Sequence, residues 1–190
     1  MQLSIKTNFP EVQQKLKRLQ SDVADKALAR AVNRTMDQAR TAMQREITKT
    51  YNLRAGYVRQ RLAVSRAVFK GPRMSLTASL MGTGKRSANL VAFLARRAPN
   101  NGRRGGPQTT FRITKGGAPT SITGAFVGNK GLTVFRRTGS KRLPIEAVRT
   151  IDVPQMFNQT DINAAVVRVI QERFPQVLEQ QVRFYASRMR

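Results

Sequence analysis

The sequence lacks cysteine, histidine and tryptophan, and the first two absences exclude much of enzyme chemistry. Without cysteine there is no disulfide, no thiolate metal site and no thiol nucleophile. Without histidine the chain lacks the commonest general base, proton shuttle and metal ligand near neutral pH. Serine–histidine–aspartate triads, cysteine–histidine dyads and ordinary zinc sites are therefore ruled out. We expect a protein that is not an enzyme and that uses no cofactor and no metal.

Long apolar runs are also missing. No segment reaches the roughly 18 apolar residues that a membrane span needs, and residues 1–12 lack the apolar stretch of a secretory signal. We therefore expect a soluble protein that works in a cytoplasm-like setting without contact to a membrane. The 190 residues are enough for one sizeable core, so a single domain over residues 1–190 is the expectation.

Acidic residues are scarce and unevenly spread. Against 35 Lys and Arg stand only 10 Asp and Glu, which gives a formal net charge of +25. Residues 47–145 hold 20 of the basic residues and no acid. Unopposed charge of this size repels itself and destabilises a lone compact state, so the pattern predicts an acidic or polyanionic partner. The alternative is a cationic surface without a partner.

Two features of the sequence resemble catalytic motifs without fulfilling them. Glu146 and Asp152 lie close enough in sequence to suggest a carboxylate pair, which would need a concave pocket around both side chains. Isolated acids in a basic chain are more often counterions, and we interpret them so. The segment GTGKRS is similar to a phosphate-binding loop, but Ser79 stands where the motif needs glycine and Arg86 where it needs a hydroxyl.

Hydrophobic periodicity predicts helices towards both ends of the chain. Apolar residues recur at helical spacing over 8–19, over 23–47 with many alanines, and over 53–62 among several arginines. A last helix over 160–190 keeps the same period, and Pro175 inside it should kink or split that helix.

Between these helices the period shifts towards two, which is typical of strands. We expect a hairpin over 121–138 whose turn is Gly128–Gly131, because Gly and Asn suit tight turns. Pro154 should close the last strand segment. The predicted class is α+β. It has a helical region over 1–70, a small, mostly antiparallel sheet over 73–153 and a C-terminal helix over 160–190. Further strand candidates are MSLTASLMG, NLVAFLA, TTFRIT and IEAVRTIDVP.

A basic loop over 95–119 interrupts the predicted sheet, and its glycines, proline and asparagines exclude a regular helix. Arginine suits bidentate contacts with phosphate or carboxylate. The residues alone leave two partners open, which are a DNA backbone whose affinity falls with salt and an acidic protein surface. No sequence-reading DNA or RNA motif is present. The candidate contact residues, including two on the hairpin, are Arg96, Arg97, Arg103, Arg104, Arg112, Lys115, Arg136 and Arg137.

Two longer segments, taken in order, resemble a known family. Residues 27–62 read ALARAVNRTMDQARTAMQREITKTYNLRAGYVRQRL, and residues 123–157 read TGAFVGNKGLTVFRRTGSKRLPIEAVRTIDVPQMF. Their order, length and spacing are similar to the minor tail protein Z family of lambda-like tailed phages, also called tail completion proteins. The resemblance covers the chain from about residue 20 to its end. The loop over 96–119 is similar only in being basic and glycine-rich, so no role is carried over to its residues.

The resemblance implies a structural virion protein that acts late in tail assembly, at the head-proximal end of the tail and the head–tail junction. It implies the tail terminator and tail tube as neighbours, and a homo-oligomeric ring, with a hexamer favoured, near the channel that holds the genome end. Its place would be the virion, and the host cytoplasm during assembly. The alternative from another class is a sequence-nonspecific nucleic-acid-binding protein of ribosomal or nucleoid type.

Overall fold

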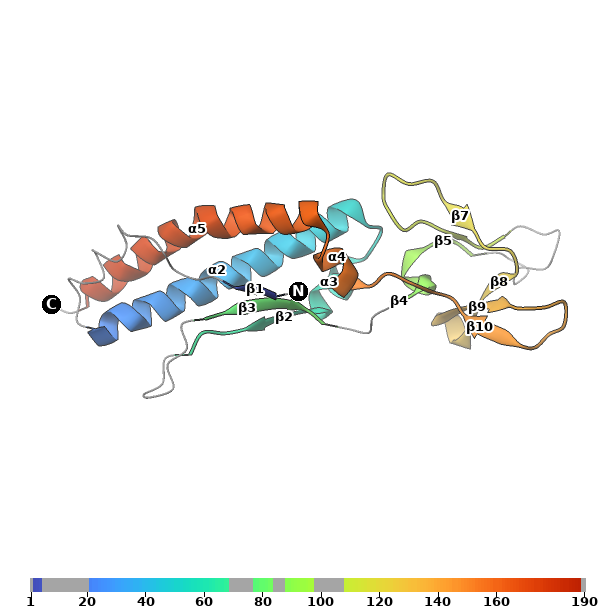
Figure 1. Ribbon diagram of the computed structural model, residues 1–190, viewed down its shortest axis with the longest axis horizontal. Coiled ribbons are helices and arrows are strands. Elements are labelled where there is room, and N and C mark those ends of the chain that lie inside the picture. The colour runs from blue at the N-terminus through green and yellow to red at the C-terminus, as the bar shows by residue number, and fades with distance from the viewer. Residues whose placement is uncertain (1, 5–20, 69–76, 84–87, 98–107, 189–190) are drawn as a thin grey trace.

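The computed structural model describes residues 2–4, 21–68, 77–83, 88–97 and 108–188. The molecule is elongated (Figure 1). Long helices and one small sheet form one end, which we call the helical part. The strands and turns of residues 88–151 form the other end, which we call the sheet part. The predicted α+β class is confirmed, and all strand pairings among the described residues are antiparallel.

Two long antiparallel helices, α2 (Ser21–Thr50) and α5 (Thr160–Ala186), run side by side through the helical part (Figure 1). The predicted helical period of α2 is confirmed, since its apolar positions are the buried ones. Small alanine side chains on this helix let neighbouring elements approach closely. The buried apolar side chains of the pair are Ala24, Ala27, Leu28, Ala29, Ala31, Val32, Met36, Ala39, Met43, Ile47, Ile162, Val166, Phe174, Val177 and Leu178.

Helix α5 is continuous through Pro175, so of the two predicted effects, a kink or a split, the split does not occur. A proline inside a helix costs about 3 kcal/mol or more, because one hydrogen bond is lost and the ring clashes with the preceding turn. Phe174, Val177 and Leu178 flank it and are buried. Each such side chain contributes about 1.5–3 kcal/mol when fully buried. The packing around Pro175 therefore outweighs its local cost.

A three-stranded sheet lies along the opposite side of α2. It consists of β1 (Gln2–Ser4), β3 (Ser79–Gly82) and β2 (Leu62–Ser65) in the order β1-β3-β2. The helix predicted over 53–62 is the shorter α3 (Ala55–Gln60), and the prediction is wrong at Leu62, which begins a strand. Leu62 pairs with Gly82 of β3, so the strand ladder provides the backbone hydrogen bonds that a longer helix would have provided. The helix predicted over 8–19 lies outside the described residues.

The sheet part contains eight described strands in three small sheets, where the sequence predicted a single sheet. The predicted hairpin is confirmed as β8 and β9, joined by a turn in which Asn129 and Lys130 have φ of 47° and 53°. The sheets have the orders β10-β9-β8, β5-β6-β7 and β11-β4. The strands are β4 (Ala88–Asn89), β5 (Leu94–Arg96), β6 (Thr110–Phe111), β7 (Thr120–Ser121), β8 (Ala125–Gly128), β9 (Thr133–Arg137), β10 (Ile145–Ala147) and β11 (Arg149–Thr150), with short 3-10 turns η2 (Leu90–Phe93) and η3 (Asn129–Gly131).

Backbone hydrogen bonds join the two parts at the end of α2. The amide of Asn52 donates to the Ile113 carbonyl at 2.9 Å, and that of Lys115 donates to the Thr50 carbonyl at 2.9 Å. One apolar cluster continues from the helices through α4 (Val153–Phe157) into the sheets, where Phe93 and Phe111 are buried. The second half of the predicted basic loop is therefore anchored to the body of the protein. None of the described helices is long and apolar enough to cross a membrane.

Candidate partner interface

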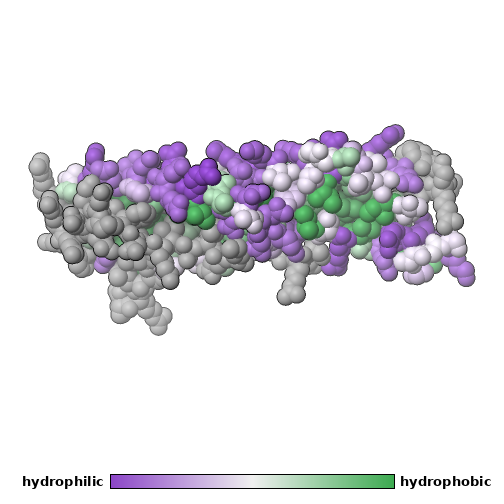
Figure 2. Space-filling model, turned by 45° about the horizontal axis from the view of Figure 1, so that its top comes forward, coloured by the Kyte–Doolittle hydropathy of each residue, from purple (hydrophilic) through white to green (hydrophobic). Residues whose placement is uncertain are grey.

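The sheet part is strongly cationic. Residues 88–151 include 12 Lys and Arg and a single acid, Glu146. On the face shown in Figure 2, the largest hydrophobic area also lies over this part, with hydrophilic residues around it. The sheet part thus combines the two kinds of surface that partners recognise, which are unopposed charge and exposed apolar area.

Four of the predicted contact residues lie on or after two paired strands, and we call them the β5–β6 group. Strand β5 carries Arg96 and is followed by Arg97, and the adjacent β6 is followed by Arg112 and Lys115. All four side chains are exposed, and within the described residues none has an ion pair or a side-chain hydrogen bond. These cations remain available to a partner. The other two loop candidates, Arg103 and Arg104, lie outside the described residues.

Arg136 and Arg137 lie on β9 in a different sheet, and both have neighbours within the chain. The Arg136 guanidinium is 3.8 Å from a carboxylate oxygen of Glu146. Because both side chains are more than half exposed, such a pair contributes about 0–1 kcal/mol. The Arg137 guanidinium lies 4.6 Å from the centre of the Phe126 ring. These two arginines therefore lie on a different sheet from the β5–β6 group.

The hypothetical carboxylate pair does not form a site. Glu146 is exposed beside Arg136, whereas the side chain of Asp152 is only 2% exposed and starts helix α4. Asp152 Oδ1 accepts hydrogen bonds from the Val153 amide at 2.8 Å and from the Tyr57 hydroxyl at 3.2 Å. Among the described residues, no group of three or more acids could hold a metal ion. Asp152 serves as a helix cap and a buried counterion.

Around Asp152, side chains from α3 and the residue after it complete a compact cluster. Arg61 Nε lies 3.4 Å from Asp152 Oδ1 without making a hydrogen bond, and the Arg61 guanidinium stacks 3.5 Å from the centre of the Tyr57 ring. Burial, together with the negative charge of Asp152, raises the pKa of Tyr57 to about 12, which Arg61 partly opposes. This cluster fastens α3 to the start of α4.

Sequence reasoning missed this cluster, although a signal for it was present. The segment Asp152–Gln155 is a capping box, in which the Gln155 side chain accepts a hydrogen bond from the Asp152 amide at 3.0 Å. Pro154 was expected to close a strand and instead lies in the first turn of α4. Proline is well tolerated there because that backbone position needs no donor.

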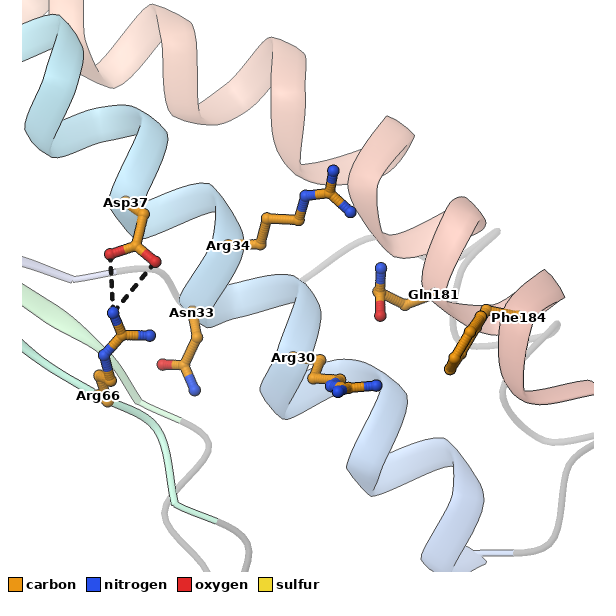
Figure 3. Close-up of a pocket in the computed structure, with 7 residues that line it drawn as sticks. All are labelled: Arg30, Asn33, Arg34, Asp37, Arg66, Gln181 and Phe184. Carbon is orange, nitrogen blue, oxygen red and sulfur yellow. Dashed lines mark hydrogen bonds and ion pairs between the residues drawn. The ribbon is translucent and has the colours of Figure 1, made fainter.

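A groove of about 480 Å³ lies between α2 and α5 (Figure 3). Arg30 and Arg34 of α2 face Gln181 and Phe184 of α5 across it (Figure 3). Asp37 accepts hydrogen bonds from Arg66 at 3.1 and 3.2 Å. With Arg30 and Arg34 also in its lining, the groove has three arginines against one acid and is cationic.

Comparison with known proteins identifies the chain. The family model of prophage minor tail protein Z matches residues 10–189, nearly the whole length. The chain belongs to this family. The match includes the helical pair, the sheet part and the Asp152 cluster, and the resemblance seen in the sequence is confirmed. No curated protein and no solved structure matches the chain.

Membership of the minor tail protein Z family gives the protein its general role. It is a structural protein of a phage tail, located in the virion, and its partners are other phage tail proteins. The family is not a known enzyme family.

Proposed function

We propose that the protein completes the head-proximal end of the tail and forms part of the head–tail junction. In this proposal several copies, with a hexamer favoured, make a ring around the channel, next to the tail terminator and the tail tube. The observation that supports this proposal most strongly is the cationic sheet part, which has 12 basic residues and one acid. A ring brings the positive charges of several copies close together, and a polyanion inside the ring neutralises the resulting repulsion between the copies.

Within this ring, the exposed cations of the β5–β6 group contact the backbone of the genomic DNA. Arg96, Arg97, Arg112 and Lys115 support this assignment because they are exposed and have no ionic partner in the described chain. Arg103 and Arg104, which lie between β5 and β6 in the sequence, are expected to extend the same contact. Phosphate contacts of this kind position a protein without reading sequence. A host ribosomal or nucleoid role has lost its support, because the matched family is a phage tail family.

Salt dependence of DNA binding tests this contact. We expect the full chain to bind duplex DNA without sequence preference and to release it as salt rises. Replacing Arg96, Arg97, Arg112 and Lys115 with Gln should lower the slope of log K against log salt by about 3–4, since each lost phosphate contact removes about 0.9.

A matched control removes the same charge from the helical part. Arg45, Lys49, Arg54 and Arg168 are exposed there and have no ion pair in the described chain. Replacing these four with Gln should leave most of the slope intact. Equal loss of slope in both variants would refute the contact, because it would show that only the net charge matters.

A further inference from the structure

One face of the β10-β9-β8 sheet is apolar and has no partner within the described protein. Phe126 of β8 is directly opposite Phe135 of β9, and Phe135 is opposite Ala147 of β10. Arg137 is likewise opposite Ile145. Residues directly opposite each other in neighbouring strands point to the same side of a sheet. These five residues therefore share one face, which we call the outer face.

The other side of the same sheet is its inner face. Ala125, Val127 and Val134 alternate with the outer residues and are buried in the core. A sheet whose inner face packs on the core usually presents polar residues on its outer face. Here two phenylalanines and an isoleucine stand in their place.

Exposure of large apolar side chains is concentrated at this sheet. In the described residues five such side chains are exposed, and three of them belong to β10 or to the turns beside β9 and β10: Leu132 at 68%, Leu143 at 64% and Ile145 at 37%. All three residues of β10 are exposed, and Phe126 and Phe135 are only partly buried. Scattered exposed apolar residues are normal, but several of them at one small sheet indicate an interaction surface.

Local packing fixes the shape of the outer face in advance. The Phe126 and Phe135 rings are 5.9 Å apart between their centres, and the Arg137 guanidinium lies over Phe126. A Cβ atom at Gly128 would come within 3.0 Å of the Phe135 ring, so the absence of a side chain there makes room for that ring. The aromatic pair is thus held in place before any partner arrives.

The positive charge around the outer face limits the class of partner that can bind there. Residues 129–147 carry Lys130, Arg136, Arg137, Lys141 and Arg142 against Glu146 alone. A second copy that presented the same face would set these cations against the same cations, and any other surface of that copy would belong to a chain of net charge +25, so electrostatic repulsion opposes both arrangements. The partner must therefore be negatively charged around the contact.

Nucleic acid would provide the negative charge, but it would not provide an apolar surface to cover the apolar side chains. Duplex phosphates would leave Ile145 and Phe135 without an apolar neighbour. Stacking of single-stranded bases needs a free aromatic ring face, and Arg137 already covers Phe126. A protein surface that is apolar at its centre and acidic around it satisfies both requirements, as polar-rimmed interfaces commonly do.

We propose that the outer face of the β10-β9-β8 sheet docks on an acidic surface of a different tail protein, with Ile145 and Leu143 as apolar anchors and Arg137 at the rim. This inference rests on the proposed function, which places the chain in the assembled tail. The two cationic regions then have separate tasks. The β5–β6 group contacts DNA, and the outer face contacts a protein neighbour.

Site-specific photo-cross-linking in assembled particles tests the docking. Ile145 is replaced by p-benzoylphenylalanine in the full chain, purified particles are irradiated, and the adducts are identified by mass spectrometry. We expect an adduct to another tail protein at a segment rich in Asp and Glu. Adducts to a second copy of the chain or to DNA, or no adduct at all, would overturn the inference. The same replacement at Val68, which is 44% exposed in the helical part, should not reach that segment.

A second variant separates docking from assembly as a whole. The double substitution Leu143→Ser and Ile145→Ser should leave the unfolding temperature of the purified chain unchanged and reduce the yield of infectious particles at least tenfold. Val68→Ser is the control and should keep the yield. An undiminished yield from the double variant would contradict the docking. Absence of the unmodified chain from purified particles would overturn the proposed function and this inference with it.

Discussion

At the scale of single residues, Asp152 is the one acid classed as buried among the residues that the structure describes. It is one of 10 acids in the chain, and it is buried where Glu146 is exposed. Its carboxylate caps α4, accepts the Tyr57 hydrogen bond and neutralises Arg61. Removing it would leave a partly buried cation and a partly buried hydroxyl without this partner, which costs more than the loss of a surface pair.

We predict that Asp152→Ala lowers the free energy of unfolding by about 2–4 kcal/mol, the sum of a lost helix cap and unsatisfied buried partners. Glu146→Ala removes the same charge from an exposed pair and should cost less than about 1 kcal/mol. Chemical denaturation of the two variants measures the difference. Equal losses would show that the cluster contributes no more than a surface ion pair.

Tyr57 gives the cluster a signature in alkaline solution. Its pKa is raised to about 12 from the ordinary value of 10.0, so the folded protein holds the phenol proton more tightly than the unfolded chain does. The resulting stabilisation is present below pH 10 and is lost as the pH rises from about 10 to 12. Tyr57→Phe should flatten this part of the stability curve and remove an ionisation near pH 12 from an absorbance titration. A titration unchanged by Tyr57→Phe would contradict the raised pKa.

At the scale of elements, the sequence was informative wherever local pattern and packing agree. Helix α2 and the β8–β9 hairpin were predictable because periodicity and turn residues point the same way. The segment after Asn89 was expected to be a strand, but Leu90–Phe93 forms a 3-10 turn. The Asn89 side chain fixes that turn by accepting hydrogen bonds from the amides of Val91 and Val134. The second of these contacts is tertiary, and no local pattern encodes it.

For the candidate interface too, local sequence pattern predicts some features and not those that depend on tertiary contacts. Its charge was visible in the sequence, because the absence of acids over residues 47–145 needs no structure to be seen. The outer face was not visible, because it depends on which residues of β9 and β10 lie opposite each other. Strand register is set by pairing between segments, and a slip of one residue would exchange the two faces.

The close approach of elements at α2 depends on small side chains. Ala31 is fully buried on this helix, whereas Ala164 is exposed on α5. We predict that Ala31→Leu lowers the free energy of unfolding by about 1–3 kcal/mol, because a larger side chain overpacks the core. Ala164→Leu should change it by less than about 0.5 kcal/mol. Thermal unfolding of both variants tests this, and an Ala31 variant as stable as the Ala164 variant would refute tight packing there.

At the scale of the whole molecule, the protein divides its surface by charge. Acids and bases are mixed along the helices, as in the groove that contains Asp37 and Arg66, while the sheet part is almost purely basic. The match to the minor tail protein Z family spans both regions. In the proposed assembly, the helical pair supports the sheet part, and the sheet part meets DNA on one surface and a protein neighbour on another.

An electron-microscopy map of the neck of the intact virion tests this account most directly. We predict a ring of copies at the head-proximal end of the tail, with Arg96 and Arg112 towards the channel and Ile145 against an acidic protein neighbour. Density for the chain elsewhere in the tail, or a sheet part that faces bulk solvent on all sides, would contradict it.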